Sequence, residues 1–180
     1  SSEFFVDQMI EFIEEDKETD SPFFAYLSFQ AQHIPLQAPQ EFIDKYLATY
    51  EEGWDILREQ RKNKAIEKGI FPPNKKIVDS MSVLDSWSAL DKDTKKMVIK
   101  SMAVFAGMLD AMDFHIGRFI TYLKKEGLYE NTIFIVTADN GPEGNDPSDH
   151  APWREWFKTT IYDRDYETLG DQDSYVYIGT

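Results

Sequence analysis

Two short polar segments could carry chemistry, because each directly follows an apolar run. Residues 23–29 are aromatic or aliphatic apart from one serine, and His33 follows them. Residues 132–137 form a second such run, and Asp139 and Asn140 follow it. Runs of this kind are typical of strands buried on both faces of a parallel sheet, whose carboxyl ends share the edge where ligands bind. We therefore expect His33, Asp139 and Asn140 to lie close together.

Asp139 and Asn140 supply hard oxygen ligands of the kind that Ca²⁺ and Mg²⁺ prefer. The alternative is a simple turn, since Asp-Asn-Gly is a frequent turn sequence and Gly141 completes it here. Residues 142–147 contain two prolines and do not resemble a returning strand, which disfavours a tight hairpin. Two ligands are too few for a metal site, so further ligands must come from elsewhere.

His33 precedes Ile34 and Pro35, where the chain is restricted to extended conformations. A histidine at the edge of a sheet suits a general acid or an anion contact. The alternative is a histidine that forms only a hydrogen bond within its loop. His115 and Asp113 lie near the apolar stripe of a predicted helix, and we interpret both as structural.

The remaining pattern predicts helices around the two strands. Residues 3–15 form an amphipathic helix, residues 40–68 form one or two surface helices, and residues 93–127 form one long helix. The apolar residues of the long helix recur at spacings of three and four and predict a buried stripe: Val98, Met102, Phe105, Leu109, Met112, Ile116, Phe119 and Leu123. This order of helices and apolar runs indicates an α/β fold, with a parallel sheet flanked by helices.

Composition excludes several classes of protein. The 180 residues carry 19 basic and 33 acidic side chains, a net charge of −14, which argues against nucleic-acid or anionic-lipid binding. The absence of cysteine excludes disulfides, zinc–thiolate sites and a cysteine nucleophile within the chain. No apolar run approaches the roughly 18 residues of a membrane span. The chain begins with Ser1 rather than methionine, and both of its ends resemble cuts in a longer protein.

Charge is distributed unevenly along the chain. Residues 139–180 form an acidic, aromatic and loop-rich segment, in which we interpret His150 and Lys158 as surface residues. Residues 58–76 are locally basic, which indicates either an anion-binding face or, as we favour, a solvated helix surface.

Taken together, these motifs resemble the type I sulfatases, the formylglycine-dependent arylsulfatases of the alkaline phosphatase superfamily. The similar motifs occur in the order that this family has: residues 22–29 with 33–39, residues 50–61 with 69–72, residues 112–123, and residues 131–132 with 139–141. The resemblance implies an alkaline-phosphatase-like fold. Residues 1–180 then form the central part of a catalytic domain, with a helical insertion at residues 40–92.

The resemblance also implies roles for the three polar residues. Asp139 and Asn140 match two ligands of a divalent metal, usually Ca²⁺, and His33 matches the histidine that contacts the sulfate and assists departure of the alcohol. The implied substrate is a small-molecule sulfate monoester, and a periplasmic or extracellular location is favoured. The implied nucleophile is a formylglycine made from the first residue of C-x-P-x-R or S-x-P-x-R.

No proline of the chain has a cysteine or serine two positions before it, so this motif is absent. We therefore expect the nucleophile to lie outside the chain, in an amino-terminal part, and the chain alone to be inactive. Two alternatives stay open: a related phosphonate or phosphodiester hydrolase, and a non-catalytic interaction domain. The sequence leaves the particular ester and the oligomeric state undetermined.

Overall fold

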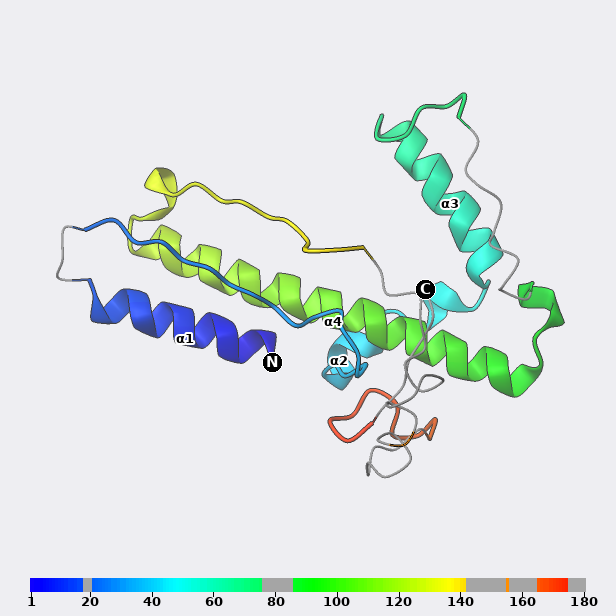
Figure 1. Ribbon diagram of the computed structural model, residues 1–180. Coiled ribbons are helices and arrows are strands. Elements are labelled where there is room, and N and C mark those ends of the chain that lie inside the picture. Colours follow the sequence, from blue (N-terminus) through cyan, green and yellow to red (C-terminus); the bar gives the residue numbers. More distant parts are fainter. Residues whose placement is uncertain (18–20, 76–85, 142–154, 156–164, 175–180) are drawn as a thin grey trace.

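The computed structural model describes residues 1–17, 21–75, 86–141, 155 and 165–174. Its α-helices are α1 (Ser2–Glu15), α2 (Gln40–Ile43), α3 (Trp54–Glu67) and α4 (Lys92–Lys125). Short 3-10 helices lie in the connections: η1 (Ala48–Tyr50), η2 (Trp87–Ala89) and η3 (Tyr129–Asn131). Helix α4 is the long central element, along which α1 and α2 lie (Figure 1).

The helices predicted at residues 3–15 and 93–127 are confirmed as α1 and α4, and local signals explain where they begin. The Ser1 side chain accepts a hydrogen bond from the backbone N–H of Phe4 at 3.4 Å. The Asp91 carboxylate accepts bonds from the N–H groups of Asp93 and Thr94, both at 2.9 Å. The bond from Thr94 lowers the pKa of the Asp91 carboxyl. Side chains of these types satisfy N–H groups that have no partner within the helix, so they determine where it begins.

Helix α1 packs against the carboxyl-terminal half of α4. Val6, Phe119 and Leu123 form the buried centre of this contact. Leu27 and Phe29, from the extended segment that follows α1, pack partly buried against the same cluster. The apolar sides of two helices and one side of an extended segment therefore share this core.

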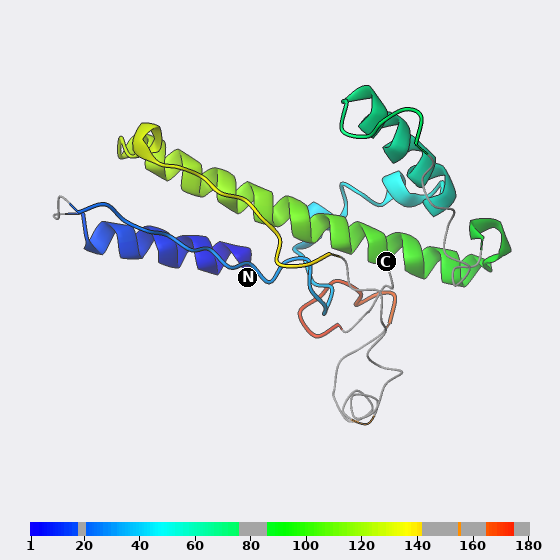
Figure 2. The same cartoon turned by 45° about the horizontal axis from the view of Figure 1, so that its top comes forward.

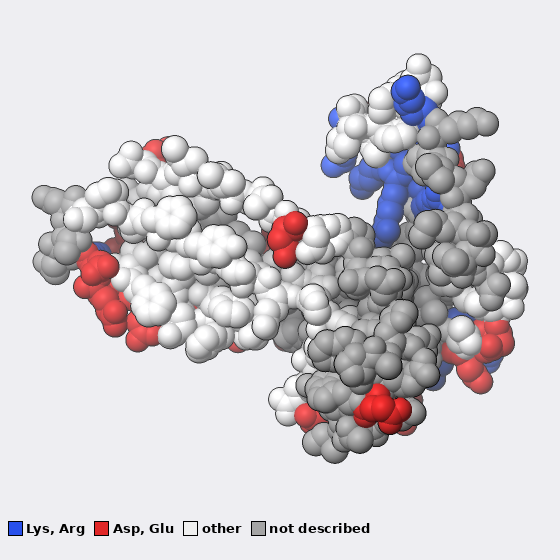
Figure 3. Space-filling model, in the orientation of Figure 1, with Lys and Arg blue, Asp and Glu red and all other residues white. Residues whose placement is uncertain are grey.

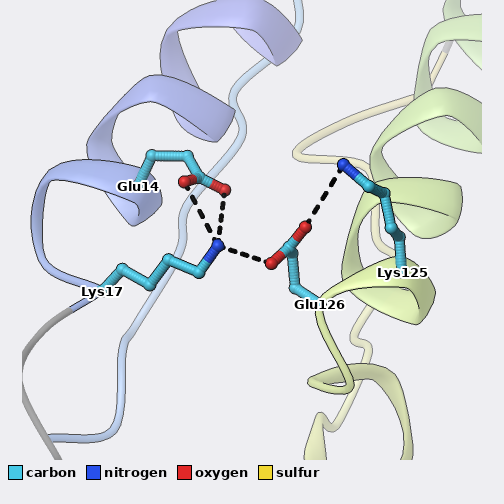
Figure 4. Close-up of polar contacts among 4 residues, drawn as sticks. All are labelled: Glu14, Lys17, Lys125 and Glu126. Carbon is cyan, nitrogen blue, oxygen red and sulfur yellow. Dashed lines mark hydrogen bonds and ion pairs between the residues drawn. The ribbon is translucent and has the colours of Figure 1, made fainter.

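A polar cluster joins the ends of α1 and α4 (Figure 4). The Lys17 ammonium lies 2.5 Å from Glu126 Oε2 and 3.4 Å from Glu14 Oε2, and Lys125 lies 3.5 Å from Glu126 Oε1. The hydrogen bond from Lys17 lowers the pKa of Glu126, and the same bond raises the pKa of Lys17. Both groups are therefore charged near neutral pH, where they tie the two helix ends together.

The second core lies between α2, the amino-terminal half of α4 and residues 165–174. Its fully buried members are Leu36, Ile43, Ala103, Val104 and Leu169. Helix α2 approaches α4 closely at Gly107, where a Cβ atom would lie 3.1 Å from the backbone nitrogen of Ile43. A larger residue at position 107 would push the two helices apart.

The predicted apolar stripe of α4 is confirmed only in part, because most of its members are half-buried, with Met102 and Phe105 packed against the second core. Phe119 and Leu123 are buried as predicted, but Leu109 is 45% exposed and the other five residues are half-buried. The stripe that is buried consists of Val104, Met108, Ala111, His115, Phe119 and Leu123. Helix α4 is apolar over more than one face, so spacing alone did not indicate which face α1 and α2 would cover.

The two predicted strands are extended segments rather than strands in the described part of the chain. No strand occurs among the described residues, and no backbone–backbone hydrogen bond there involves residues 21–29 or 133–138. Several apolar side chains on these segments face solvent, including Phe24, Ile133 and Val136 at 90% exposure or more. A strand requires a hydrogen-bonded neighbour, and neither segment has one here. The predicted parallel sheet is therefore not confirmed.

The two extended segments nevertheless run in the same direction. Figures 1 and 2 show that residues 21–30 and residues 132–141 both run from the carboxyl-terminal end of α4 towards its middle. Both segments are thus antiparallel to α4, and both end near its middle.

Helix α3 extends away from α4, and lysine and arginine side chains gather over it (Figures 1 and 3). Gly53 precedes it with a φ of 82°, so the stretch at residues 40–68, predicted to form one or two helices, is divided at this residue. On the face shown in Figure 3, the surface over the extended segments is mainly uncharged, and acidic side chains gather at the end of α1. Among the described helices, none is long and apolar enough to cross a membrane.

Candidate functional site

His33 lies in the irregular loop that follows the first extended segment, and it is exposed. Its backbone N–H donates to the carbonyl oxygen of Gln30 at 2.8 Å. Its ring atom Nδ1 lies 2.7 Å from the carbonyl oxygen of Ile34. A carbonyl oxygen only accepts, so Nδ1 carries the hydrogen of this bond. The other ring nitrogen, Nε2, is therefore the atom that would exchange a proton with a bound group.

Asp139 and Asn140 lie at the end of the second extended segment and are exposed. Asp139 Oδ1 accepts the backbone N–H of Asn140 at 3.0 Å, and Asn140 Nδ2 donates to the carbonyl oxygen of Gly141 at 2.6 Å. These bonds hold both side chains in a tight local turn. They leave Asp139 Oδ2 and Asn140 Oδ1 without a hydrogen bond to another described residue.

Asp139 Oδ2 and Asn140 Oδ1 fit part of a site for a hard cation such as Ca²⁺, because both are oxygen ligands and one belongs to a carboxylate. They do not make a complete site. No group of three or more histidine, aspartate or glutamate side chains that could hold a metal ion occurs among the described residues. A cation held here needs most of its ligands from other parts of the protein.

The described structure does not join the predicted site residues directly. No hydrogen bond or ion pair between described residues connects His33 with Asp139 or Asn140. The two extended segments that precede these residues do run in the same direction along α4 (Figures 1 and 2). The predicted proximity of the three residues stays a prediction.

Of the other titratable residues singled out from the sequence, His115 has structural surroundings. His115 is buried, and its Nδ1 lies 2.9 Å from Arg118 Nη1, while Arg118 Nη2 lies 2.7 Å from Asp7 Oδ1. His115 thus belongs to a link between α4 and α1, which agrees with the structural role predicted for it. Asp113 is exposed, so the structural role predicted for it is not confirmed. His150 and Lys158 lie outside the described residues.

The sequence did not predict the contacts that residues 165–174 make with α4 and with residues 31–39. Lys100 is buried in α4, and its ammonium donates to the carbonyl oxygens of Tyr166 and Glu167 at 2.7 and 3.2 Å. Gln37 pairs with Gly170 in a single parallel bridge. One signal was available, because Lys100 lies four residues before Val104, on a mainly apolar face where a lysine needs a partner.

Comparison with known proteins identifies the family. A family model described as Sulfatase matches residues 1–170, which is nearly the whole chain. The chain belongs to the sulfatase family, and the resemblance noted in the sequence is confirmed. Membership of this family implies an alkaline-phosphatase-like fold for the protein.

The chain is 36% identical to an uncharacterized sulfatase of Schizosaccharomyces pombe, and the match covers 99% of this chain and 32% of that protein. It is 31% identical to an arylsulfatase of Klebsiella aerogenes, over 99% of this chain and 38% of that protein. An arylsulfatase of Clostridium perfringens is 27% identical over 87% of this chain and 28% of its own length. The chain therefore spans about a third of the length of these relatives.

Proposed function

We propose that this chain is the central part of a sulfuric ester hydrolase that cleaves an aryl sulfate monoester. His33 contacts the sulfate and protonates the departing alcohol, and Asp139 and Asn140 bind a divalent cation, Ca²⁺. The family match over residues 1–170 carries the proposal. The direction of the two extended segments supports it, because these three residues follow the ends of segments that run the same way.

The proposed role of His33 follows from its hydrogen bond. Cleavage of a sulfate ester leaves negative charge on the alcohol oxygen, and a positioned acid that donates a proton there lowers the barrier. With Nδ1 held by the carbonyl oxygen of Ile34, Nε2 is the nitrogen that can donate this proton. The bond also limits rotation of the ring, so the proton is offered in one direction.

Asp139 and Asn140 would act by holding the cation. A divalent cation bound to their free oxygens would neutralise negative charge on the sulfate. The nucleophile has no counterpart in the chain, which lacks cysteine and has no serine or cysteine two residues before a proline. The proposal therefore requires a formylglycine motif in another part of the protein, and a full-length sequence without it would contradict the proposal. In keeping with the family, we propose a periplasmic or extracellular location.

Turnover by the full-length protein tests the reaction. We expect hydrolysis of p-nitrophenyl sulfate, loss of activity with a chelator, and recovery on addition of Ca²⁺. Parallel assays with a p-nitrophenyl phosphodiester and a phosphonate monoester separate the sulfatase from a related hydrolase. Preference for either phosphorus ester would contradict the proposed substrate class, and no turnover of any ester would favour a non-catalytic interaction domain.

Two variants test the residue roles. His33→Gln should lower kcat by about 10²- to 10⁴-fold for phenyl sulfate, the range typical of a lost general acid. The loss should be smaller for p-nitrophenyl sulfate, whose leaving group needs less protonation. Asp139→Asn should raise the Ca²⁺ concentration needed for activity. Asp113→Asn is the matched control, since Asp113 is also an exposed aspartate. Full activity of either site variant would contradict its assigned role.

The isolated 180-residue chain should be inactive towards sulfate esters. It should also bind Ca²⁺ weakly, because the described residues hold no cluster of three or more candidate ligands. Calorimetric titration of the chain with Ca²⁺ measures this, and submicromolar affinity would show that the ligand set is more complete than we propose.

A further inference from the structure

The loop that carries His33 is anchored at its far end by a segment more than 130 positions later in the chain. The backbone N–H of Ala38 donates to the carbonyl oxygen of Gly170 at 3.0 Å. The Gln37 side-chain amide donates to the carbonyl oxygens of Gln172 and Ser174, at 2.5 and 3.2 Å. Gln37 thus links the loop to residues 170–174 through its side chain as well as through its backbone.

The anchoring segment is itself firmly packed. Leu169 is 1% exposed and belongs to the same core as Leu36, which precedes Gln37 and is also 1% exposed. A Cβ atom on Gly170 would lie 2.7 Å from Ile43 Cδ1, so this residue is in close contact with α2. Lys100 of α4 holds the beginning of the segment through the carbonyl oxygens of Tyr166 and Glu167. Residues 165–174 are therefore a rigid support for the loop.

Between Gln37 and His33 the chain has little freedom. Pro35 has a restricted φ, and Leu36 is fixed by burial in the core. The residue before Pro35 is Ile34, whose carbonyl oxygen accepts the bond from His33 Nδ1. The position of that carbonyl decides the orientation of the imidazole ring and which of its nitrogens carries the hydrogen.

We propose that Gln37 is a positioning residue for His33. Its amide clamps the loop to residues 170–174 and so holds the Ile34 carbonyl where it orients the imidazole. This inference rests on the proposed function, in which His33 protonates the leaving alcohol. Gln37 itself contacts no reacting atom. Its contribution is to keep Nε2 of His33 directed at one place.

The test compares Gln37→Leu with Gln40→Leu in the full-length protein. Leucine matches the size of glutamine but offers no N–H groups, so both carbonyl oxygens lose their donor. Gln40 is the matched control, because its amide donates to Asp44 Oδ1 of the same surface, at 2.6 Å on the exposed side of α2, and to no other described residue. Gln37→Asn is a milder second variant, which keeps the amide on a shorter side chain and serves if the leucine variant does not fold.

The first measurement is independent of catalysis. Nitrogen-15 NMR of the histidine side chains distinguishes the two tautomers, and His33→Gln identifies the His33 signals. We expect Nδ1–H in the wild-type protein and in Gln40→Leu, and a mixture of tautomers in Gln37→Leu and Gln37→Asn. An unchanged tautomer in a folded Gln37 variant would overturn the proposal.

The second measurement is kinetic. Gln37→Leu should lower kcat for phenyl sulfate by about tenfold, which corresponds to roughly 1.4 kcal/mol, with a smaller change in KM. The loss should shrink for p-nitrophenyl sulfate, whose leaving group depends less on the proton. Equal losses for both esters would mean that Gln37 only supports the fold, and would also overturn the proposal. If the wild-type protein cleaves no sulfate ester, the proposed function fails, while the NMR result still decides whether Gln37 orients His33.

Discussion

At the scale of single residues, the contact between α1 and α4 contains a tyrosine, Tyr122, whose pKa is raised. Burial raises the pKa of Tyr122 to about 12, and the neighbouring carboxylate of Glu14 adds to the rise. Glu14 and Glu126 both oppose ionisation of this tyrosine, whereas Lys17 favours it. The polar cluster of Figure 4 therefore lies where charge on α1 influences a side chain of α4.

We expect Tyr122 to stay neutral in the folded protein at pH values where an unfolded tyrosine already ionises, because its pKa is raised to about 12. An unfolded tyrosine ionises near pH 10, so stability from this residue should be lost as the pH rises from about 10 to 12. Ultraviolet difference titration measures the ionisation, and Tyr122→Phe identifies the late component. Glu14→Gln should lower the pKa of Tyr122, whereas Glu15→Gln, the neighbouring control, should not. Ionisation of Tyr122 near pH 10 would contradict this account.

At the scale of elements, the molecule depends on two contacts of α4. Its carboxyl-terminal half packs on α1, and its amino-terminal half packs on α2 and on residues 165–174. The second contact leaves no room at Gly170, which has a φ of 104° and lies against Ile43 and Val104. Glycine is required there both by its backbone conformation and by the space available.

Gly170→Ala should lower the free energy of unfolding by about 1–3 kcal/mol, because the new methyl group overpacks the core and the backbone is strained. Gly127→Ala is the control, since Gly127 also has a positive φ, of 73°, but nothing within 4 Å of the added Cβ. The smaller loss at Gly127 measures backbone strain alone. Urea denaturation gives both free energies of unfolding. Equal losses would show that the side chains around position 170 shift enough to accommodate the new methyl group.

At the scale of the whole molecule, the chain presents an apolar surface that its own described residues do not cover. Ile133, Ile135 and Val136 are 86% exposed or more, and the surface around the two extended segments is mainly uncharged (Figure 3). A face of this kind marks an interaction site in a soluble protein. Under our proposal, further strands and helices of the full-length protein cover it.

One double substitution tests whether this face is covered, because it should have opposite effects in the isolated chain and in the full-length protein. Ile133→Ser with Val136→Ser should reduce dye binding and self-association of the isolated chain, measured by ANS fluorescence and light scattering. In the full-length protein the same pair should lower stability by about 3–6 kcal/mol, since burial of each side chain is worth about 1.5–3 kcal/mol. Ile70→Ser is the control, because Ile70 lies beyond α3 and is 75% exposed. Unchanged stability of the full-length variant would mean that the face stays exposed.

The sequence by itself determined the features that depend on near neighbours along the chain. Apolar spacing predicted α1 and α4 nearly to their ends, because helical hydrogen bonds join residues only four positions apart. The order of the motifs identified the family, and it identified His33, Asp139 and Asn140 as candidates. Local bonds then set the details at these residues, such as the hydrogen on His33 Nδ1.

Only the tertiary structure decided which face of α4 is buried and which distant segment supports the His33 loop. Spacing predicted Leu109 inside and it lies outside, because α1 and α2 cover a different part of an apolar helix. The bonds from Gln37 to Gln172 and Ser174 join residues about 135 positions apart, for which no local pattern exists. The predicted sheet needs hydrogen-bonded neighbours that the described residues do not supply. Contacts between distant segments depend on the whole arrangement of the chain, so no short stretch of sequence encodes them.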